Sequence, residues 1–176
     1  QARPLYHQFV ESAQGLEPRY ISMITPSRWF VGGMNLNEFR EQMLNDSRLK
    51  TLVDFPDSRD AFGGVDIAGG VSYFLWEKSY EGTCSVTTVK GSEHHGPRER
   101  KLNEFDVFVR DNDAAQILSR IVTREDFRSL SSIVSAISPF GLSTAFRGEE
   151  TADRISNPII VRSTAGRQFA NRDVVS

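Results

Sequence analysis

The chain has 176 residues, of which 39% are hydrophobic and 12 are Phe, enough to fill the core of an ordinary domain. This composition excludes wholesale disorder, and the lack of any apolar run of about 18 residues excludes a membrane-spanning helix. The formal net charge of -2 gives no general preference for a polyanionic partner. The single cysteine, Cys84, excludes an internal disulfide and fits a reducing cytoplasm, and we expect it to be a small buried strand residue.

The first third of the chain is predicted to alternate helices with strands. Apolar side chains four residues apart predict a helix over 4–14, and a mostly apolar run predicts a strand over 20–25. A second helix over 36–45 and a strand over 49–55 follow. This strand–helix–strand order favours an α/β fold with a largely parallel sheet.

Glycines then interrupt the alternation. Residues 60–70 contain four glycines and are followed by apolar runs at 71–76 and 83–89, separated by a turn. These two runs predict an antiparallel hairpin added to the edge of the sheet. The polar, charged stretch 91–101 predicts an exposed loop.

Three further elements are predicted from the spacing of apolar residues: a strand over 105–109 and helices over 113–122 and 126–137. Ser138-Pro139 ends the last helix. Beyond it the pattern weakens to short β-like runs such as 159–162, so a domain boundary is expected at 138.

Several short strings, taken in order, resemble segments of the adenine-N6 DNA methyltransferases of restriction–modification systems. The resemblance is closest to the large type II enzymes that join a methylase to a nuclease. It is carried by Pro4–Glu11, Tyr20–Phe30, Leu36–Arg40, Phe62–Phe74 and Ser138–Leu142. The last string is similar to the Pro-Phe-Gly element that opens the recognition region of that family.

The resemblance implies a fold and two domains. Residues 1–138 would be the C-terminal part of the methyltransferase catalytic domain, forming the second half of a Rossmann-like methyltransferase sheet with an antiparallel hairpin. Residues 139–176 would be the start of the DNA target-recognition region. The full-length enzyme would transfer a methyl group from S-adenosylmethionine to adenine N6 in double-stranded DNA.

Two motifs that this activity requires are missing from the sequence. No Gly-x-Gly-x-x-Gly occurs to accept the cofactor, and none of the seven prolines adjoins another, so there is no Pro-Pro-aromatic motif to hold the target amine. The chain also starts at Gln1 rather than Met. We therefore expect an internal fragment that neither binds S-adenosylmethionine nor methylates by itself.

The resemblance places the wall of the target-base pocket at Phe62. Its ring would stack on the adenine flipped out of the duplex, with Gly63 and Gly64 letting the backbone approach the base. Ser27 and Arg28 follow the end of a predicted strand, where open α/β sheets bind ligands, so they are expected to line the same pocket or contact phosphate. The structural alternatives are core packing for Phe62 and a simple turn for Ser27 and Arg28.

Other residues suggest weaker sites. Arg147, Arg162 and Arg167 are candidates for DNA contacts, with a solvated tail as the alternative. His94 and His95 lack companions at metal-ligand spacing, so no metal site is expected. Four acidic residues could suggest a nuclease centre but lack a Glu-x-Lys partner: Asp54, Asp57, Asp60 and Asp66.

The expected partner is double-stranded DNA, together with a fused or separate restriction endonuclease, and no membrane. Sheet edges left open by a missing half would favour self-association of the fragment. A non-catalytic DNA-binding or scaffold module that shares the fold is the alternative to an enzyme fragment.

Overall fold

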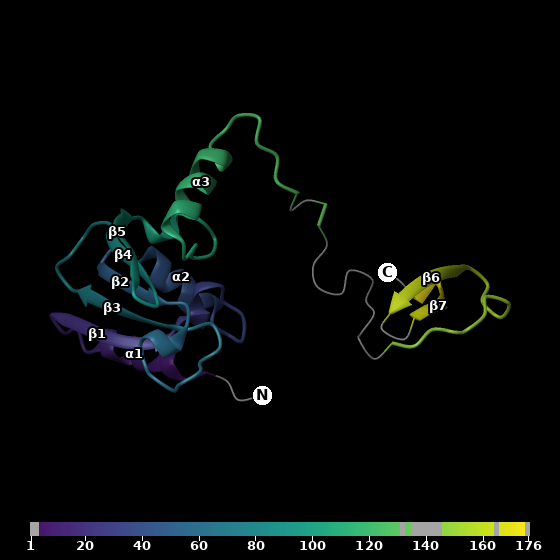
Figure 1. Ribbon diagram of the computed structural model, residues 1–176, viewed down its shortest axis with the longest axis horizontal. Helices are drawn as coiled ribbons and strands as arrows, with labels where there is room; N and C mark the ends of the chain where they lie inside the picture. Colours follow the sequence, from purple (N-terminus) through teal and green to yellow (C-terminus); the bar gives the residue numbers. More distant parts are fainter. Residues whose placement is uncertain (1–3, 131–132, 135–145, 164–165, 175–176) are drawn as a thin grey trace. The chain divides into compact units, whose positions relative to one another are not determined.

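The computed structural model describes residues 4–130, 133–134, 146–163 and 166–174. The chain divides into two compact units, Gln1–Glu125 and Asp126–Ser176, each with its own sheet (Figure 1). The predicted boundary at 138 lies outside the described residues.

The first unit combines helices and strands, which confirms the α/β class. Its helices are α1 (Tyr6–Gly15), α2 (Asn37–Asn45) and α3 (Asn112–Val122). Its strands are β1 (Tyr20–Pro26), β2 (Leu49–Phe55), β3 (Val71–Glu77), β4 (Cys84–Lys90) and β5 (Glu93–Arg100). Three short 3-10 turns complete it: η1 (Ser27–Phe30), η2 (Ser58–Asp60) and η3 (Leu102–Glu104).

The five strands lie in the order β1-β3-β2-β4-β5. Strand β3 runs antiparallel to both of its neighbours, and only β2 and β4 pair in parallel. The prediction of a largely parallel sheet is therefore wrong. The strand–helix–strand order does leave β1 and β2 pointing the same way, but the returning strand β3 lies between them.

The predicted hairpin is also wrong, because β3 and β4 lie on opposite sides of β2. The hairpin of this region is β4–β5 instead, and residues 93–100 of the predicted loop form β5. All residues of β5 except Arg100 are exposed. An exposed edge strand carries the charged side chains that are also typical of a loop, which is why the sequence pattern did not distinguish the two.

Two further predicted elements are not found. Residues 105–109 form no strand: the Phe108 side chain is buried in the core, and its backbone N donates to Phe30 O at 3.0 Å outside any ladder. In the predicted helix over 126–137, the described residues 126–130 and 133–134 contain no α-helix. The remainder of that helix lies outside the described residues.

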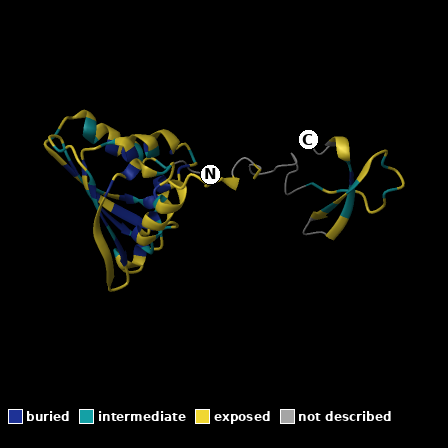
Figure 2. Ribbon diagram, turned by 90° about the horizontal axis from the view of Figure 1, so that it is seen from above, coloured by how far each residue is buried: buried dark blue, intermediate teal, exposed yellow. Residues whose placement is uncertain are grey.

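The core of the first unit lies on one face of the sheet. Along β1 and β3 the buried Ile21, Phe74 and Trp76 alternate with the exposed Tyr20 and Tyr73. The buried face packs against apolar residues of α1, α2 and η1 in one continuous cluster. In Figure 2 the buried positions of this unit follow the strands and the helix sides turned toward them.

The second unit contains an antiparallel hairpin of β6 (Pro158–Ser163) and β7 (Gly166–Asn171), followed by η5 (Arg172–Val174). Glu149 bridges to Phe169 on β7, with backbone hydrogen bonds of 2.8 Å in both directions. The β-like run predicted at 159–162 is thus confirmed within β6.

Candidate functional site

Polar side chains gather where β1 and β2 end and β3 begins. Thr25 of β1 pairs with Ser72 of β3, Ser72 pairs with Asp54 of β2, and Asp54 pairs with Thr88 of β4. All four are buried, each with at most 4% of its surface exposed. The buried residues of β1 to β4 in the rows before this one are apolar, so among these four strands the buried polar groups lie at this end.

Asp54 lies at the centre of this row with none of its surface exposed. Ser27 Oγ donates to its Oδ1 at 3.0 Å, while Arg110 Nε donates to Oδ2 at 2.7 Å and Nη2 to Oδ1 at 2.6 Å. Burial raises the pKa of Asp54, and the hydrogen bonds and charge of Arg110 offset that rise only in part. Both carboxylate oxygens are already engaged by protein donors, which argues against a nuclease role for Asp54.

Two of the other acids considered for a nuclease centre, Asp57 and Asp60, are also engaged elsewhere. Asp57 forms an ion pair with Arg59 at 2.6 Å, and Asp60 Oδ2 accepts a hydrogen bond from Gly91 N at 2.8 Å. Among the residues that the structure describes, no group of three or more His, Cys, Asp or Glu side chains is arranged to hold a metal ion.

The loop between β2 and β3, residues 56–70, folds around the buried hydroxyl of Ser58. Ser58 Oγ donates to Val65 O at 2.7 Å and accepts from Ile67 N at 2.8 Å, and Ser58 O accepts from Phe62 N at 2.8 Å. One side chain thereby fixes the middle of the loop. We call residues 56–70 the glycine loop.

The last two residues of the glycine loop, Gly69 and Gly70, are held close to the end of β2. Ser27 N donates to Gly70 O at 3.0 Å, and Arg110 Nη1 donates to Gly69 O at 2.8 Å. Gly70 has a φ of +77°, and a Cβ at this position would collide with the carbonyl oxygens of Phe55 and Pro56. Only glycine allows this approach.

Phe62 lies on the glycine loop outside the buried core cluster, with 41% of its surface exposed. A Cβ added at Gly63 or Gly64 would meet no atom within 4 Å, so both glycines border open space. The structure therefore gives Phe62 an accessible ring on a loop with a fixed backbone.

Ser27 and Arg28 differ in accessibility although they are neighbours in η1. Ser27 is 2% exposed and its hydroxyl is engaged by Asp54. Arg28 is exposed and forms no ion pair with any described residue. Ser27 thus stabilises the site through a buried hydrogen bond, while the guanidinium of Arg28 is accessible to an anion.

In the second unit, Arg162 of β6 and Arg167 of β7 lie directly opposite each other. Both are exposed, and Arg167 lies over the Phe169 ring at 5.4 Å. Arg147 instead lines a cavity of about 350 Å³ beside β7, which Arg154 also lines. Like charges opposite each other across two strands are destabilising, so the Arg162–Arg167 pair would be stabilised by an anion.

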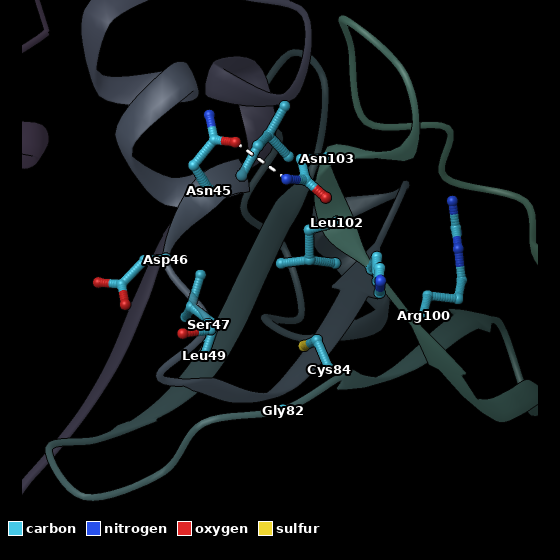
Figure 3. A pocket seen from close by; sticks show the side chains of 11 residues that line it. Asn45, Asp46, Ser47, Leu49, Gly82, Cys84, Arg100, Leu102 and Asn103 are labelled. Carbon is cyan, nitrogen blue, oxygen red and sulfur yellow. Dashed lines mark hydrogen bonds between the residues drawn. The ribbon is translucent and has the colours of Figure 1, made fainter.

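A cavity of the first unit lies at the opposite end of the sheet, where β2 and β4 begin (Figure 3). Its volume is about 230 Å³, and Asn103 Nδ2 donates to Asn45 Oδ1 across it at 3.0 Å. Cys84 lines it as a buried residue, as predicted, and burial raises the pKa of its thiol to about 12. A thiol held protonated in this way is not a nucleophile at neutral pH.

Sequence reasoning missed the pairing of Asp54 with Arg110. A carboxylate within an apolar strand does indicate a buried charge that needs a cationic partner. The partner, however, lies 56 residues away in the chain, and the sequence offers many arginines.

Comparison with known proteins identifies the chain's relatives. Residues 1–62 match the family model of the Eco57I restriction-modification methylase. A protein of Mycoplasma pneumoniae described as an uncharacterized adenine-specific methylase is 31% identical over 121 residues, which cover 68% of this chain and 28% of that protein. The chain thus spans less than a third of the length of this curated relative.

No helix in the described part of the chain is long and apolar enough to cross a membrane.

The resemblance predicted from the sequence is confirmed at the level of the family. Through its first 62 residues, the chain belongs to the Eco57I restriction–modification methylase family.

Proposed function

We propose that this chain is part of a site-specific DNA methyltransferase that transfers the methyl group of S-adenosylmethionine to adenine N6, within a restriction–modification system. The family match over residues 1–62 and the description of the Mycoplasma relative support this proposal. The partners would be double-stranded DNA and a fused or separate restriction endonuclease, in the cytoplasm.

The observation that carries the proposal is the accessible ring of Phe62 on a loop fixed at its middle and its end. Flipping an adenine out of the duplex costs a few kcal/mol of stacking and pairing, which an aromatic platform can offset. A platform with a fixed backbone loses little further freedom when the base binds. Phe62 would stack on the base, with Gly63, Gly64, Ser27 and Arg28 around it.

The chain would supply only part of the enzyme. Residues 1–138 would be the C-terminal part of the catalytic domain, as the second half of a Rossmann-like sheet, and 139–176 the start of the recognition region. Strand β1 pairs with β3 alone among the described strands, so its other edge can accept the strands of the first half. In the isolated chain the same edge would favour self-association.

The test of the base platform is the substitution of Phe62 by Ala in the full-length enzyme. We expect methylation and the fluorescence of a 2-aminopurine at the target position to fall, corresponding to about 1–3 kcal/mol of lost stacking. Phe62→Tyr keeps the aromatic face and serves as the control. Unchanged flipping and methylation in a folded Phe62→Ala enzyme would contradict the role of Phe62.

Cofactor binding is tested separately on the chain itself. Because it lacks a Gly-x-Gly-x-x-Gly loop, calorimetry should detect no binding of S-adenosylmethionine. Micromolar affinity would refute the proposal that the cofactor half lies elsewhere.

A non-catalytic DNA-binding module is the second candidate, and the opposed Arg162 and Arg167 favour it, with Arg147 as a further contact. The reading frame upstream of Gln1 separates the two functions. An enzyme fragment requires a Pro-Pro-Tyr or Pro-Pro-Phe motif within a few dozen codons of Gln1 and a Gly-rich motif before it. A start codon at this point would favour the binding module.

A further inference from the structure

Arg110 is held at both its backbone and its side chain. Its carbonyl oxygen accepts a hydrogen bond from Thr88 Oγ1 of β4 at 2.8 Å. Its guanidinium donates hydrogen bonds to both carboxylate oxygens of Asp54 at the end of β2, a pairing that we call the Arg110 fork. The guanidinium also donates to Gly69 O and lies over the Phe30 ring at 5.4 Å. One side chain therefore joins β2, the glycine loop and the aromatic core.

These contacts require an arginine. The planar guanidinium directs Nε and Nη2 to one carboxylate and leaves Nη1 for the carbonyl of Gly69. A lysine ammonium is a single point charge and cannot reproduce this fork while also reaching a second acceptor.

The two acceptors of the Arg110 side chain, Asp54 and Gly69, lie close to the two ends of the glycine loop. Asp54 comes two residues before the glycine loop, and Gly69 is the next-to-last residue of the loop. Arg110 thus fixes the distance between the two ends of the loop, while Ser58 fixes its middle. The backbone that presents Phe62 has few remaining ways to move.

Because Asp54 is buried, we expect the hydrogen bonds of the Arg110 fork to form and break together. A fully buried carboxylate such as Asp54 is costly unless its charge is paired and hydrogen-bonded, so its contacts with Arg110 favour one closed arrangement. When the fork opens, the Asp54 pair and the Gly69 contact are lost together.

We propose that Arg110 is a positioning residue for the target base: through Asp54 and Gly69 it holds the glycine loop in the form that presents Phe62. This inference rests on the proposed role of Phe62. Arg110 itself need not touch the base.

The same strand provides a matched control. Near the opposite end of β2, Arg48 forks onto Asp46 with Nε at 2.7 Å and Nη2 at 2.9 Å and lies over the Trp76 ring at 4.7 Å. This pair has the chemistry of the Arg110 fork but makes no contact with the glycine loop. Substitution of Arg48 by Lys therefore controls for the general cost of losing an Arg–Asp fork.

The first experiment measures amide hydrogen exchange in the chain with Arg110→Lys or Arg48→Lys. We expect Arg110→Lys to speed the exchange of the Phe62, Val65 and Gly70 amides by about tenfold or more, without a similar change along β1. Arg48→Lys should leave these three amides unchanged. Equal rates in the wild type and Arg110→Lys would overturn the proposal, as would faster exchange spread evenly over the sheet.

A double variant keeps the test usable if Arg110→Lys does not fold. Asp54→Asn combined with Arg110→Gln removes both charges together, and replacing a buried pair by neutral residues is often tolerated. It should show the same local increase in exchange in the glycine loop. A folded double variant with wild-type exchange there would refute the proposal.

The second experiment measures base flipping in the full-length enzyme with 2-aminopurine DNA. We expect Arg110→Lys to lower the flipped population and raise KM for DNA several-fold, in the direction of Phe62→Ala, while Arg48→Lys has no effect. If only Phe62→Ala lowers flipping, the inference about Arg110 fails and the proposed function stands. If neither variant does, the proposed role of Phe62 fails as well.

Discussion

The two ends of β2 carry the same chemical pair in different settings. Near its start, Arg48 forks onto Asp46 at 2.7 and 2.9 Å, and at its end Arg110 forks onto Asp54 at 2.7 and 2.6 Å. Each arginine also lies over an aromatic ring, Trp76 or Phe30. Their differences therefore reflect the surroundings rather than the pair itself.

At the start of β2 the polar groups are matched. Asp46 Oδ2 accepts hydrogen bonds from Trp76 Nε1 at 2.9 Å and from Gln14 Nε2 at 3.3 Å. Burial acts to raise the pKa of Asp46, but the hydrogen bonds from Arg48 and Trp76 outweigh it and lower that pKa. This end of β2 therefore has a structural role.

At the end of β2 the matching is incomplete. The buried hydroxyls of Thr25 and Ser72 have no hydrogen-bond partner among the described residues, and burial raises the pKa of Asp54. The exposed ring of Phe62 belongs to the loop held here. Together with the accessible ring of Phe62, these buried polar groups without partners are consistent with the proposed site at this end of β2.

The largest loss of stability is expected from substitutions of glycines that lie near the two ends of β2. In Gly70→Ala the new Cβ collides with backbone oxygens of Phe55 and Pro56 at a positive φ, and we expect about 3 kcal/mol or more of lost stability. In Gly82→Ala the three atoms nearest to the new Cβ all belong to the Tyr80 side chain, which can move more readily than backbone. Urea denaturation of both variants measures the difference. Similar losses would show that the approach at Gly70 is not specially constrained.

The sequence predicts the local elements of this chain better than their neighbours in space. The predicted strand over 49–55 coincides with β2, and the helix over 36–45 is found to within one residue as α2. Their periodicity is a local property, set by which side chains face the core. The insertion of β3 between β1 and β2 depends instead on pairing across long stretches of chain, which no local pattern contains.

The candidate site follows the same division. Phe62, Gly63 and Gly64 could be singled out because the string that contains them resembles a segment of the family's methyltransferases. Arg110 could not, because it follows a stretch predicted as a strand and its importance comes from Asp54 and Gly69, both distant in sequence. Charge complementarity indicates that Asp54 needs a partner, but not which arginine provides it.

The start of β2 should show an intermediate effect when its carboxylate is removed. In Asp46→Ala the buried Trp76 Nε1 loses its acceptor, and an unsatisfied buried donor costs about 1–3 kcal/mol. Glu77→Ala, which removes the ion pair with Lys50 and a hydrogen bond from Ser79 Oγ, is the control and should cost less stability than Asp46→Ala. Equal losses in urea denaturation would show that the Asp46 network contributes no more than a surface ion pair.

The smallest effect is also the sharpest test of the comparison, because the two carboxylates should respond to pH with opposite signs. The folded-state pKa of Asp46 lies below its ordinary value of 3.8, so its contribution to stability is present above that value and is lost as the pH falls through the folded pKa. The folded-state pKa of Asp54 lies above 3.8, so its contribution is complete below 3.8 and declines as the pH rises through the folded pKa.

Substitution by Asn removes each titration in turn. When the pH is lowered from about 6 to about 2.5, the stability difference between the wild type and Asp46→Asn should shrink, because the wild type loses the advantage of an ionised Asp46. Over the same range the difference between the wild type and Asp54→Asn should grow, because protonation relieves the burial of the Asp54 charge. Urea denaturation at a series of pH values measures both differences. If both shrink together, Arg110 stabilises the Asp54 carboxylate as fully as Arg48 stabilises that of Asp46, and the two ends of β2 are electrostatically alike.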